Sequence, residues 1–185
     1  MANHVCPWWV GYLLLFPFRR WRQNPQKWLG PFVKEGSVVL EPGPGMGFFT
    51  LDLARMVGAS GRVVAVDLQE KMVEALRRRA SKAGLLERID LRLGQPDRLG
   101  VDDLEGTVDL VVAIFCVHEM SDGDAFFTEA HRALRPGGRL IVAEPRFHVS
   151  KEAFERFVAA AERTGFTREE SSPFSGPHAV LLVRP

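Results

Sequence analysis

The sequence has little cysteine, no long hydrophobic run and no strong excess of charge of either sign. Its 185 residues include two cysteines, Cys6 and Cys116, and no C-x-x-C pair. We therefore expect neither a disulfide framework nor a metal site, and a reducing cytoplasm is the predicted location. The 24 basic and 23 acidic side chains nearly cancel, so no broad basic surface is available to bind a nucleic-acid duplex by counterion release. We expect no nucleic-acid partner.

Acidic residues are also missing from residues 1–34, which carry five Lys or Arg side chains, all four tryptophans and the only tyrosine. The apolar run at residues 8–18 spans 11 residues, too few to cross a bilayer, which takes about 20 residues. The arginines follow this run, whereas a secretory signal carries its positive charge before the apolar part. We therefore predict that residues 1–34 pack against a single domain formed by residues 35–185.

Beyond residue 35, short buried strands alternate with amphipathic helices. Apolar or alternating runs predict strands at residues 37–41, 62–67, 88–93, 108–115, 139–143, 165–166 and 179–183. Helical spacing predicts helices at residues 48–57, 68–83, 124–134 and 151–164, with the arginines at 77–79 largely on a solvated face. This alternation is typical of an α/β fold with a parallel sheet and helices on both faces. The last connection has no helical pattern, so the final strand is predicted to be antiparallel.

The strongest local signal is the turn EPGPGMG at residues 41–47, between a predicted strand and a predicted helix. Glycines let the backbone approach a ligand closely, and a helix N-terminus offers free N–H groups. Asp67 follows Gly45 by 22 residues and ends the next strand, where it can accept hydrogen bonds from ribose hydroxyls. The pattern predicts an adenosine-containing ligand. The spacing G-x-G-x-G differs from the dinucleotide fingerprint, and Glu41 would repel a pyrophosphate but suits a cationic ammonium group.

Four motifs in this order resemble those of class I S-adenosylmethionine-dependent methyltransferases, closest to the small ubiquinone/menaquinone-biosynthesis-type (methyltransferase type 11) group. They are VLEPGPGMG at 39–47, VAVD at 64–67, VDLVVAIF at 108–115 and LRPGGRLIV at 134–142. The resemblance implies a Rossmann-like, doubly wound seven-stranded sheet, mostly parallel with an antiparallel last strand. It implies S-adenosyl-L-methionine as the cofactor.

The residues that match the family's cofactor-binding motifs, or stand at their positions, are Glu41, Gly43, Gly45, Gly47, Asp67, Leu68, Gln95, Asp97 and Phe115. Two positions depart from the family. At the entrance of the glycine loop the family usually has Asp where this chain has Glu41, which retains the charge. After the third strand the family often has an Asp following a Gly, which binds the adenine amine. Here Gln95 follows the glycine and Asp97 comes two residues later, so either side chain is a candidate for the adenine edge.

Methyl transfer from a sulfonium is an in-line displacement, so the protein mainly aligns the nucleophile and excludes water. A base is needed only if the nucleophile must lose a proton. His118 and Glu119, after the fourth strand, are the candidate catalytic bases, although a surface or capping histidine is an equal interpretation of His118. Glu144 and His148, after the fifth strand, are candidate substrate contacts. Cys116 is expected to be a small buried hydrophobe rather than a nucleophile.

The acceptor is predicted to be a small molecule. The Asn/Asp-Pro-Pro-aromatic segment of amino-methylating DNA enzymes and the Pro-Cys pair of cytosine C5 enzymes are both missing. The acceptor atom (O, N, S or C) and the oligomeric state are not determined by the sequence. A non-catalytic S-adenosylmethionine-binding protein and, less favoured, a nucleotide-dependent oxidoreductase are the alternative functions.

The aromatic segment 1–34 is predicted to close over the cofactor as a lid. Trp8, Trp9 and Tyr12 are its expected contacts with the acceptor. The alternative is a shallow interfacial anchor, with aromatic side chains in the headgroup region and arginines toward anionic lipid. Membrane-surface contact is less favoured because proline and glycine residues interrupt any long amphipathic helix.

Overall fold

The computed structural model describes residues 7–9, 11, 15, 21, 23–169 and 178–185. Its elements are α3 (Pro25–Leu29), β1 (Val38–Pro42), α4 (Thr50–Met56), β2 (Arg62–Asp67), α5 (Glu70–Lys82), η1 (Leu86–Arg88), β3 (Ile89–Leu93), η2 (Asp102–Leu104), β4 (Val108–Ile114), η3 (Val117–Glu119), α6 (Gly123–Ala133), β5 (Leu134–Ala143), α7 (Lys151–Arg163), β6 (Thr167–Arg168) and β7 (Ala179–Val183). The strands form a seven-stranded sheet in the order β3-β2-β1-β4-β5-β7-β6. β7 runs antiparallel to β5, which confirms the predicted mostly parallel sheet with a reversed last strand. No helix in the described part of the chain is long and apolar enough to cross a membrane.

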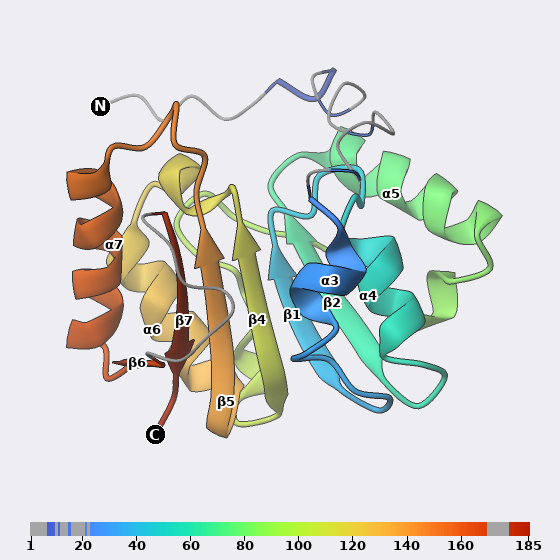
Figure 1. Ribbon diagram of the computed structural model, residues 1–185. Helices are drawn as coiled ribbons and strands as arrows, with labels where there is room; N and C mark the ends of the chain where they lie inside the picture. The colour runs from blue at the N-terminus through green and yellow to red at the C-terminus, as the bar shows by residue number, and fades with distance from the viewer. Residues whose placement is uncertain (1–6, 10, 12–14, 16–20, 22, 170–177) are drawn as a thin grey trace. The chain divides into compact units, whose positions relative to one another are not determined.

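Residues 5–94 form one compact unit, which contains β1, β2 and β3. These strands are parallel, with Val39 beside Val63 and Val63 beside Ile89. α4 and α5 both pack on β2, and α3 packs on α4 (Figure 1). β1 and β2 are almost wholly buried, which explains why each is a continuous apolar run rather than an alternating one.

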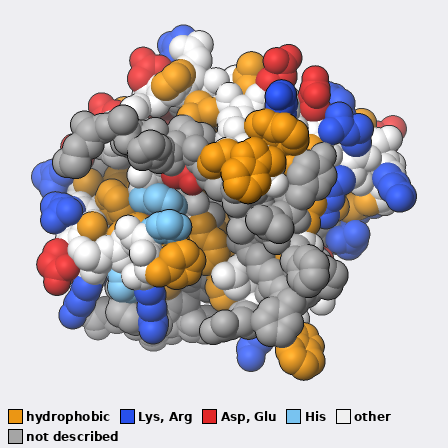
Figure 2. Space-filling view, turned by 90° about the horizontal axis from the view of Figure 1, so that it is seen from above, with side chains coloured by type: hydrophobic (Ala, Val, Ile, Leu, Met, Phe, Trp, Pro, Cys, Tyr) orange, Lys and Arg blue, Asp and Glu red, His pale blue; other side chains and the backbone are white. Residues whose placement is uncertain are grey.

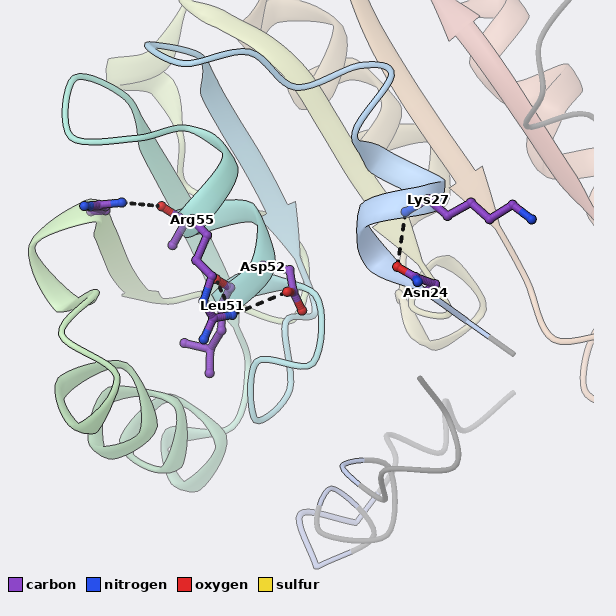
Figure 3. A network of polar contacts seen from close by, with 7 residues as sticks. Asn24, Lys27, Leu51, Asp52 and Arg55 are labelled. Carbon is purple, nitrogen blue, oxygen red and sulfur yellow. Dashed lines mark hydrogen bonds and ion pairs between the residues drawn. The ribbon is translucent and has the colours of Figure 1, made fainter. Parts of the chain in front are cut away.

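Polar contacts stabilise α3 and α4, the short helices that precede and follow β1 in the sequence (Figure 3). The Asn24 side chain accepts a hydrogen bond from the Lys27 N–H at 3.2 Å and so caps α3. In α4, Arg55 Nη1 donates to the Leu51 carbonyl at 3.2 Å and lies 3.4 Å from Asp52 Oδ1. Asp52 is buried, and a buried carboxylate is costly without such a partner. The pair therefore allows a charged residue on the packed side of α4.

Residues 95–185 belong to the second compact unit, around β4, β5, β7 and β6. α6 packs on β5 and on α7 (Figure 1). Asp122 and Ser150 cap these helices by accepting hydrogen bonds from backbone N–H groups in their first turns. Phe127 of α6 and Phe154 of α7 are fully buried and supply much of the apolar contact in this unit.

Two strands differ from the prediction by more than one residue at a boundary. β5 begins at Leu134 rather than residue 139, because Leu134 pairs with Val108 before the register shifts and Arg139 pairs with Leu110. The intervening residues 135–138 form a bulge, in which Gly137 has a φ of +74° and its N–H donates to the Arg184 carbonyl at 2.8 Å.

The other difference is at the end of α7, where a strand was predicted at residues 165–166. There the N–H groups of Gly165 and Phe166 donate back to the carbonyls of Glu162 and Ala161. Gly165 has a φ of +111°, the left-handed conformation that commonly closes a helix. Both residues are thus used by the helix end, and β6 begins only at Thr167.

Substituting Phe127→Ala should lower the free energy of unfolding by about 3–5 kcal/mol, because it removes a fully buried ring and leaves a cavity. Urea denaturation followed by circular dichroism measures this change. Phe147→Ala is the control, since that ring is 85% exposed, and its effect should stay within about 0.5 kcal/mol. Equal effects of the two substitutions would contradict the packing described for α6.

Candidate functional site

The turn after β1 is a glycine loop that packs tightly at Gly47 and has free space beside Gly45. Gly43, Gly45 and Gly47 have φ values of +64°, +55° and +83°, which other residues adopt only with strain. A Cβ on Gly47 would lie 2.3 Å from Leu76 Cδ1, whereas a Cβ on Gly45 would meet nothing within 4 Å. The loop therefore rests on α5 at Gly47 and leaves room for a ligand beside the backbone of Gly45.

Asp67 holds this loop from the end of β2. Its Oδ2 accepts a hydrogen bond from the Gly45 N–H at 3.0 Å, and its Oδ1 accepts one from the Gln69 N–H at 2.9 Å. Burial raises the pKa of Asp67, and the N–H groups of Gln69 and Gly45 oppose that rise. A carboxylate offers about four acceptor positions, so Asp67 can hold the loop and still accept hydrogen bonds from ligand hydroxyls.

Glu41 is a buried acid in β1. Its Oε2 and the Thr50 Oγ1 are buried without a hydrogen-bond partner among the described residues. Burial raises the pKa of Glu41 to about 8, and the Asp67 carboxylate adds to the rise; the nearby Thr50 hydroxyl opposes it but is not within hydrogen-bond geometry of the carboxyl in this structure. Buried polar atoms are nearly always paired, and pairing Glu41 with a cation would remove the cost of its ionisation. The site thus fits a ligand that carries an ammonium group.

Arg79 contacts the glycine loop, which the sequence analysis did not foresee. Arg77 and Arg78 are exposed as predicted, but the Arg79 guanidinium donates a hydrogen bond to the Met46 carbonyl. Burial lowers the pKa of Arg79, and the nearby Arg55 lowers it further. Its spacing of three residues from the buried Leu76 is the signal that could have placed Arg79 beside the buried stripe.

Two described residues near the N-terminus, Gly11 and Leu15, lie against an apolar cluster that includes Met46 of the glycine loop. Leu15 packs against a cluster formed by Met46, Met72 and Ala75. A Cβ on Gly11 would lie 3.0 Å from the Cε atoms of both Met46 and Met72. These contacts join the N-terminal segment to the glycine loop and to α5 at once.

Two of the three aromatic residues predicted to contact the acceptor, Trp8 and Trp9, are described by the structure. Lys71 Nζ lies 4.7 Å from the centre of the Trp8 ring, within the range of a cation–π interaction. Trp8 and Trp9 are 38% and 56% exposed. Tyr12 lies outside the described residues.

The candidate base is bound to a buried carboxylate. His118 Nδ1 lies 2.6 Å from Glu144 Oε2, and Glu144 Oε1 accepts a hydrogen bond from the Val117 N–H at 2.9 Å. The Glu144 side chain is 0% exposed and that of His118 is 23% exposed. Glu119 Oε1 lies 3.8 Å from His118 Nε2, which is beyond hydrogen-bond distance. The structure thus brings His118 and Glu144 together, with Glu119 acting on the ring through its charge.

The surroundings of His118 make it more basic than an ordinary histidine. The hydrogen bond to Glu144 raises the pKa of His118, burial opposes the rise, and the charges of Glu144 and Glu119 add to it. The ring of His148 lies nearly parallel to that of His118, with centroids 6.0 Å apart and an interplanar angle of 16°. Figure 2 shows histidine side chains reaching the surface beside hydrophobic and acidic ones. The predicted substrate contact His148 therefore adjoins the candidate base.

Phe115, which follows β4, is strained. Its φ is +62°, and it is the one non-glycine residue with a positive φ in the part of the chain that the structure describes. Its N–H donates to the Ala143 carbonyl at 2.8 Å. Strained residues of this kind cluster at ligand sites. Cys116, the next residue, is buried, as a small hydrophobe would be.

The adenine contacts predicted after β3 are the least defined part of the site. Gln95 and Asp97 are exposed, and the Gln95 side-chain oxygen accepts a hydrogen bond from Arg98 Nε at 3.0 Å. Leu68, directly after Asp67, is 39% exposed and presents apolar surface. Within the described ranges, no three His, Cys, Asp or Glu side chains are grouped to hold a metal ion.

A family model described as a methyltransferase domain matches residues 39–138. The chain belongs to the class I S-adenosylmethionine-dependent methyltransferase family. The matched region contains the glycine loop, Asp67 and His118, and it ends before Glu144. S-adenosyl-L-methionine is the cofactor of this family.

Sequence relatives support this family assignment. The methyltransferase is 33% identical over 126 residues to a ubiquinone/menaquinone biosynthesis C-methyltransferase UbiE of Hydrogenovibrio crunogenus, covering 68% of this chain and 48% of that protein. The same enzyme of Haemophilus ducreyi is 33% identical over 60% of this chain and 42% of its own length. The chain therefore spans less than half of these curated relatives.

Solved structures match the chain along almost its whole length. A SAM-dependent methyltransferase from Aquifex aeolicus superposes with a TM-score of 0.83 at 25% identity, covering 97% of this chain and 98% of that one. A methyltransferase structure from Methanococcus maripaludis gives 0.75 at 17% identity, covering 99% and 95% of the two chains. The second likeness supports the fold alone.

Glu41→Gln should change how the stability of the ligand-free methyltransferase depends on pH. The folded-state pKa of Glu41 is raised from 4.5 to about 8, so between these values the unfolded chain ionises this group while the folded chain keeps it protonated. Stability therefore falls as pH rises through this window. Gln does not titrate, and the variant should lose less stability between pH 5 and pH 8, by at least about 1.4 kcal/mol, which corresponds to one pKa unit.

Urea denaturation of both proteins at a series of pH values measures this difference. Glu74→Gln is the matched control. The Glu74 side chain is 56% exposed, so this substitution should leave the pH profile unchanged. Superimposable profiles for wild type and Glu41→Gln would show that Glu41 is not held protonated in the folded chain.

Proposed function

We propose that this methyltransferase binds S-adenosyl-L-methionine at the glycine loop and transfers its methyl group to a small-molecule acceptor. The observation that carries the proposal is the buried carboxyl of Glu41, whose Oε2 lacks a partner among the described residues, beside a loop that is open at Gly45. The bound donor supplies a methyl group already activated on a sulfonium. The chain has to bind the donor, orient the acceptor and exclude water.

Each cofactor-binding residue has a distinct role in this proposal. Glu41 would accept the ammonium group of the donor, and the backbone of Gly43, Gly45 and Gly47 would allow its close approach. Asp67 would accept hydrogen bonds from the ribose hydroxyls. The exposed surface of Leu68, together with Gln95, Asp97 and Phe115, would contact the adenine ring.

The acceptor side of the proposal rests on the residues after β4 and β5. His118 is the candidate base, Glu119 adds negative charge beside it, and His148 stacks against it. Sequence relatives are named for ubiquinone and menaquinone biosynthesis, which supports a small organic acceptor. The nearly balanced charge supports the absence of a nucleic-acid partner, and the low cysteine count supports a cytoplasmic location.

The N-terminal segment is proposed to act as a lid on the donor. Leu15 and Gly11 contact Met46 of the glycine loop, so the segment reaches the loop that the donor would occupy. Trp8 and Trp9 retain exposed ring surface that an acceptor could contact. Such a lid would exclude water from the transfer step.

Donor binding should release protons. At pH 6.5 the Glu41 carboxyl is protonated, because its pKa of about 8 lies well above that pH. An ammonium group beside Glu41 favours the ionised form, so binding should expel up to about one proton. Calorimetric titration of S-adenosylmethionine in buffers of different ionisation enthalpy, such as phosphate and Tris, measures this release as a buffer-dependent heat.

Two controls test whether proton release depends on the contact between the ammonium group and Glu41. 5′-Methylthioadenosine lacks the amino-acid group, so its binding heat should not depend on the buffer. Glu41→Gln should bind S-adenosylmethionine more weakly and release no proton. A wild-type protein that shows no binding would refute the proposed function, whereas binding without proton release would refute only the contact with Glu41.

Deleting residues 1–22 should separate donor binding from turnover. The deletion keeps Asn24, which caps α3, and leaves the glycine loop and Asp67 in place. The affinity for S-adenosylmethionine should therefore change by less than about tenfold, or 1.4 kcal/mol. Methyl transfer should fall far more, because the lid is gone. Full turnover by the truncated protein, with loss of co-sedimentation with anionic vesicles, would instead support the membrane-anchor interpretation.

A further inference from the structure

The outer edge of β3 (Ile89–Leu93) is complementary to a second copy of itself. We propose that two copies of this chain associate by pairing their β3 strands antiparallel, with Leu91 of each copy opposite Leu91 of the other. The two-fold axis of the dimer then passes between these two residues. This interaction surface is independent of the methyl transfer proposed above.

β3 is the end strand of the sheet. The strand order begins at β3, and β2 pairs with it in parallel. Within the described ranges, no strand other than β2 pairs with β3. A strand in this position presents a row of backbone N–H and C=O groups, to which a further strand can add. At five residues, β3 has the ordinary length of a strand that forms such a ladder.

The backbone groups of β3 that face outward are those of Ile89, Leu91 and Leu93. At the end of the ladder the Gly94 N–H donates to the Asp67 carbonyl of β2 at 2.9 Å. The backbone groups of successive residues in a strand face opposite sides, so the residues at odd positions in β3 direct theirs away from β2. Centring an antiparallel pair on Leu91 lets all three of these residues exchange hydrogen bonds with the second copy.

The same register pairs opposite charges. Asp90 of each copy then lies opposite Arg92 of the other. Because the odd positions make the hydrogen bonds, these charge pairs occupy non-hydrogen-bonded positions, where the Cα atoms are about 4.5 Å apart and side chains are closest. A shift of the register by two residues would place Asp90 opposite Asp90 or Arg92 opposite Arg92. The two charges therefore select the register centred on Leu91.

The side chains of Asp90 and Arg92 are available for this pairing. Arg92 Nε and Nη2 both donate to Asp90 Oδ2, at 3.0 and 2.7 Å, so Oδ1 can accept from the second copy. The Asp90 and Arg92 side chains are 41% and 22% exposed. Leu93 is 58% exposed and would gain Ile89 of the second copy as its neighbour across the pair.

These features favour a second copy over a strand of another protein. Charged side chains on an edge strand normally prevent it from pairing with other edges. In β3 the two charges are opposite in sign and two residues apart, so a two-fold axis through Leu91 satisfies both of them at once. An unrelated strand would gain the backbone hydrogen bonds but would meet an unmatched charge unless it carried the same pattern.

Charge reversal tests the dimer in the full chain by sedimentation velocity over a series of concentrations. We expect the wild type to show a monomer–dimer equilibrium. Asp90→Arg places two like-charge contacts in each dimer, and so does Arg92→Asp, so each should raise the Kd of the dimer at least about tenfold. Asp124→Arg is the matched control, because it breaks an exposed ion pair with Arg163 outside β3, and it should leave the Kd unchanged. A monomeric wild type would overturn the proposal.

Mixing the two single variants tests whether the charges face each other. In Asp90→Arg both positions are positive, and in Arg92→Asp both are negative, so all contacts between unlike chains are attractive. The mixture should form a heterodimer, and the double variant Asp90→Arg/Arg92→Asp should self-associate like the wild type. The double variant keeps an ion pair within the strand, so it remains informative where a single variant folds poorly. A double variant that is folded by circular dichroism but monomeric would overturn the proposed pairing.

Leu91→Cys tests the register. The Cα atoms of a hydrogen-bonded antiparallel pair are about 5.5 Å apart, a separation that a disulfide can span. Mild oxidation should therefore link position 91 of one copy to position 91 of the other, which peptide mass analysis detects. Leu93→Cys is the control. Leu93 is more than half exposed but lies opposite Ile89 in this register, so its variant should link far less. Equal linking of the two variants would refute the register.

Discussion

Three buried carboxylates near the carboxyl ends of strands determine the polar contacts described within each compact unit. Strands buried on both faces have little room for charge except where they end, and Glu41 in β1, Asp67 in β2 and Glu144 after β5 lie at such places. Two of them are satisfied by the protein itself. Asp67 accepts backbone N–H groups of the glycine loop and of Gln69, and Glu144 accepts the Val117 N–H and His118. Glu41 is the exception, since its Oε2 lacks a partner among the described residues.

Asp67 and Glu144 are therefore held in place by the protein itself, whereas Glu41 is left to be paired by a ligand. Asp67 and Glu144 fix the geometry of their neighbours before any ligand arrives, so little ordering is left to be done when one binds. Glu41 instead makes the ligand-free chain less stable at neutral pH than it would be with a neutral residue, because burial opposes its ionisation. A ligand that binds only the folded state recovers this stability by mass action. At Glu41, a ligand would recover this stability through a cationic group that pairs with the carboxylate.

The features that the sequence predicts well are those encoded by neighbours along the chain. β2 was predicted to the residue because a continuous apolar run ends at the acid Asp67, and the glycine loop was recognised from its spacing and its place after a strand. The features that were not predicted involve partners far away in sequence. The bulge at residues 135–138 depends on the Arg184 carbonyl, and the His118–Glu144 pair joins residues 26 positions apart. Arg79 was assigned to a solvated face; its spacing from Leu76 could have placed it beside the buried stripe, but no side-chain pattern reveals that its acceptor is the Met46 carbonyl.

α5 gives the glycine loop and the proposed lid a common support. Leu76 leaves no space for a side chain at Gly47, Arg79 binds the carbonyl of Met46, and Met72 packs with the Met46 side chain and with Leu15 of the N-terminal segment. Met46 is therefore both a residue of the loop and part of the apolar cluster against which Gly11 and Leu15 lie. A donor that orders the loop also orders this cluster, and by reciprocity a docked segment favours the loop conformation that binds the donor. Donor binding and lid closure, as proposed, would thus share one structural element, α5.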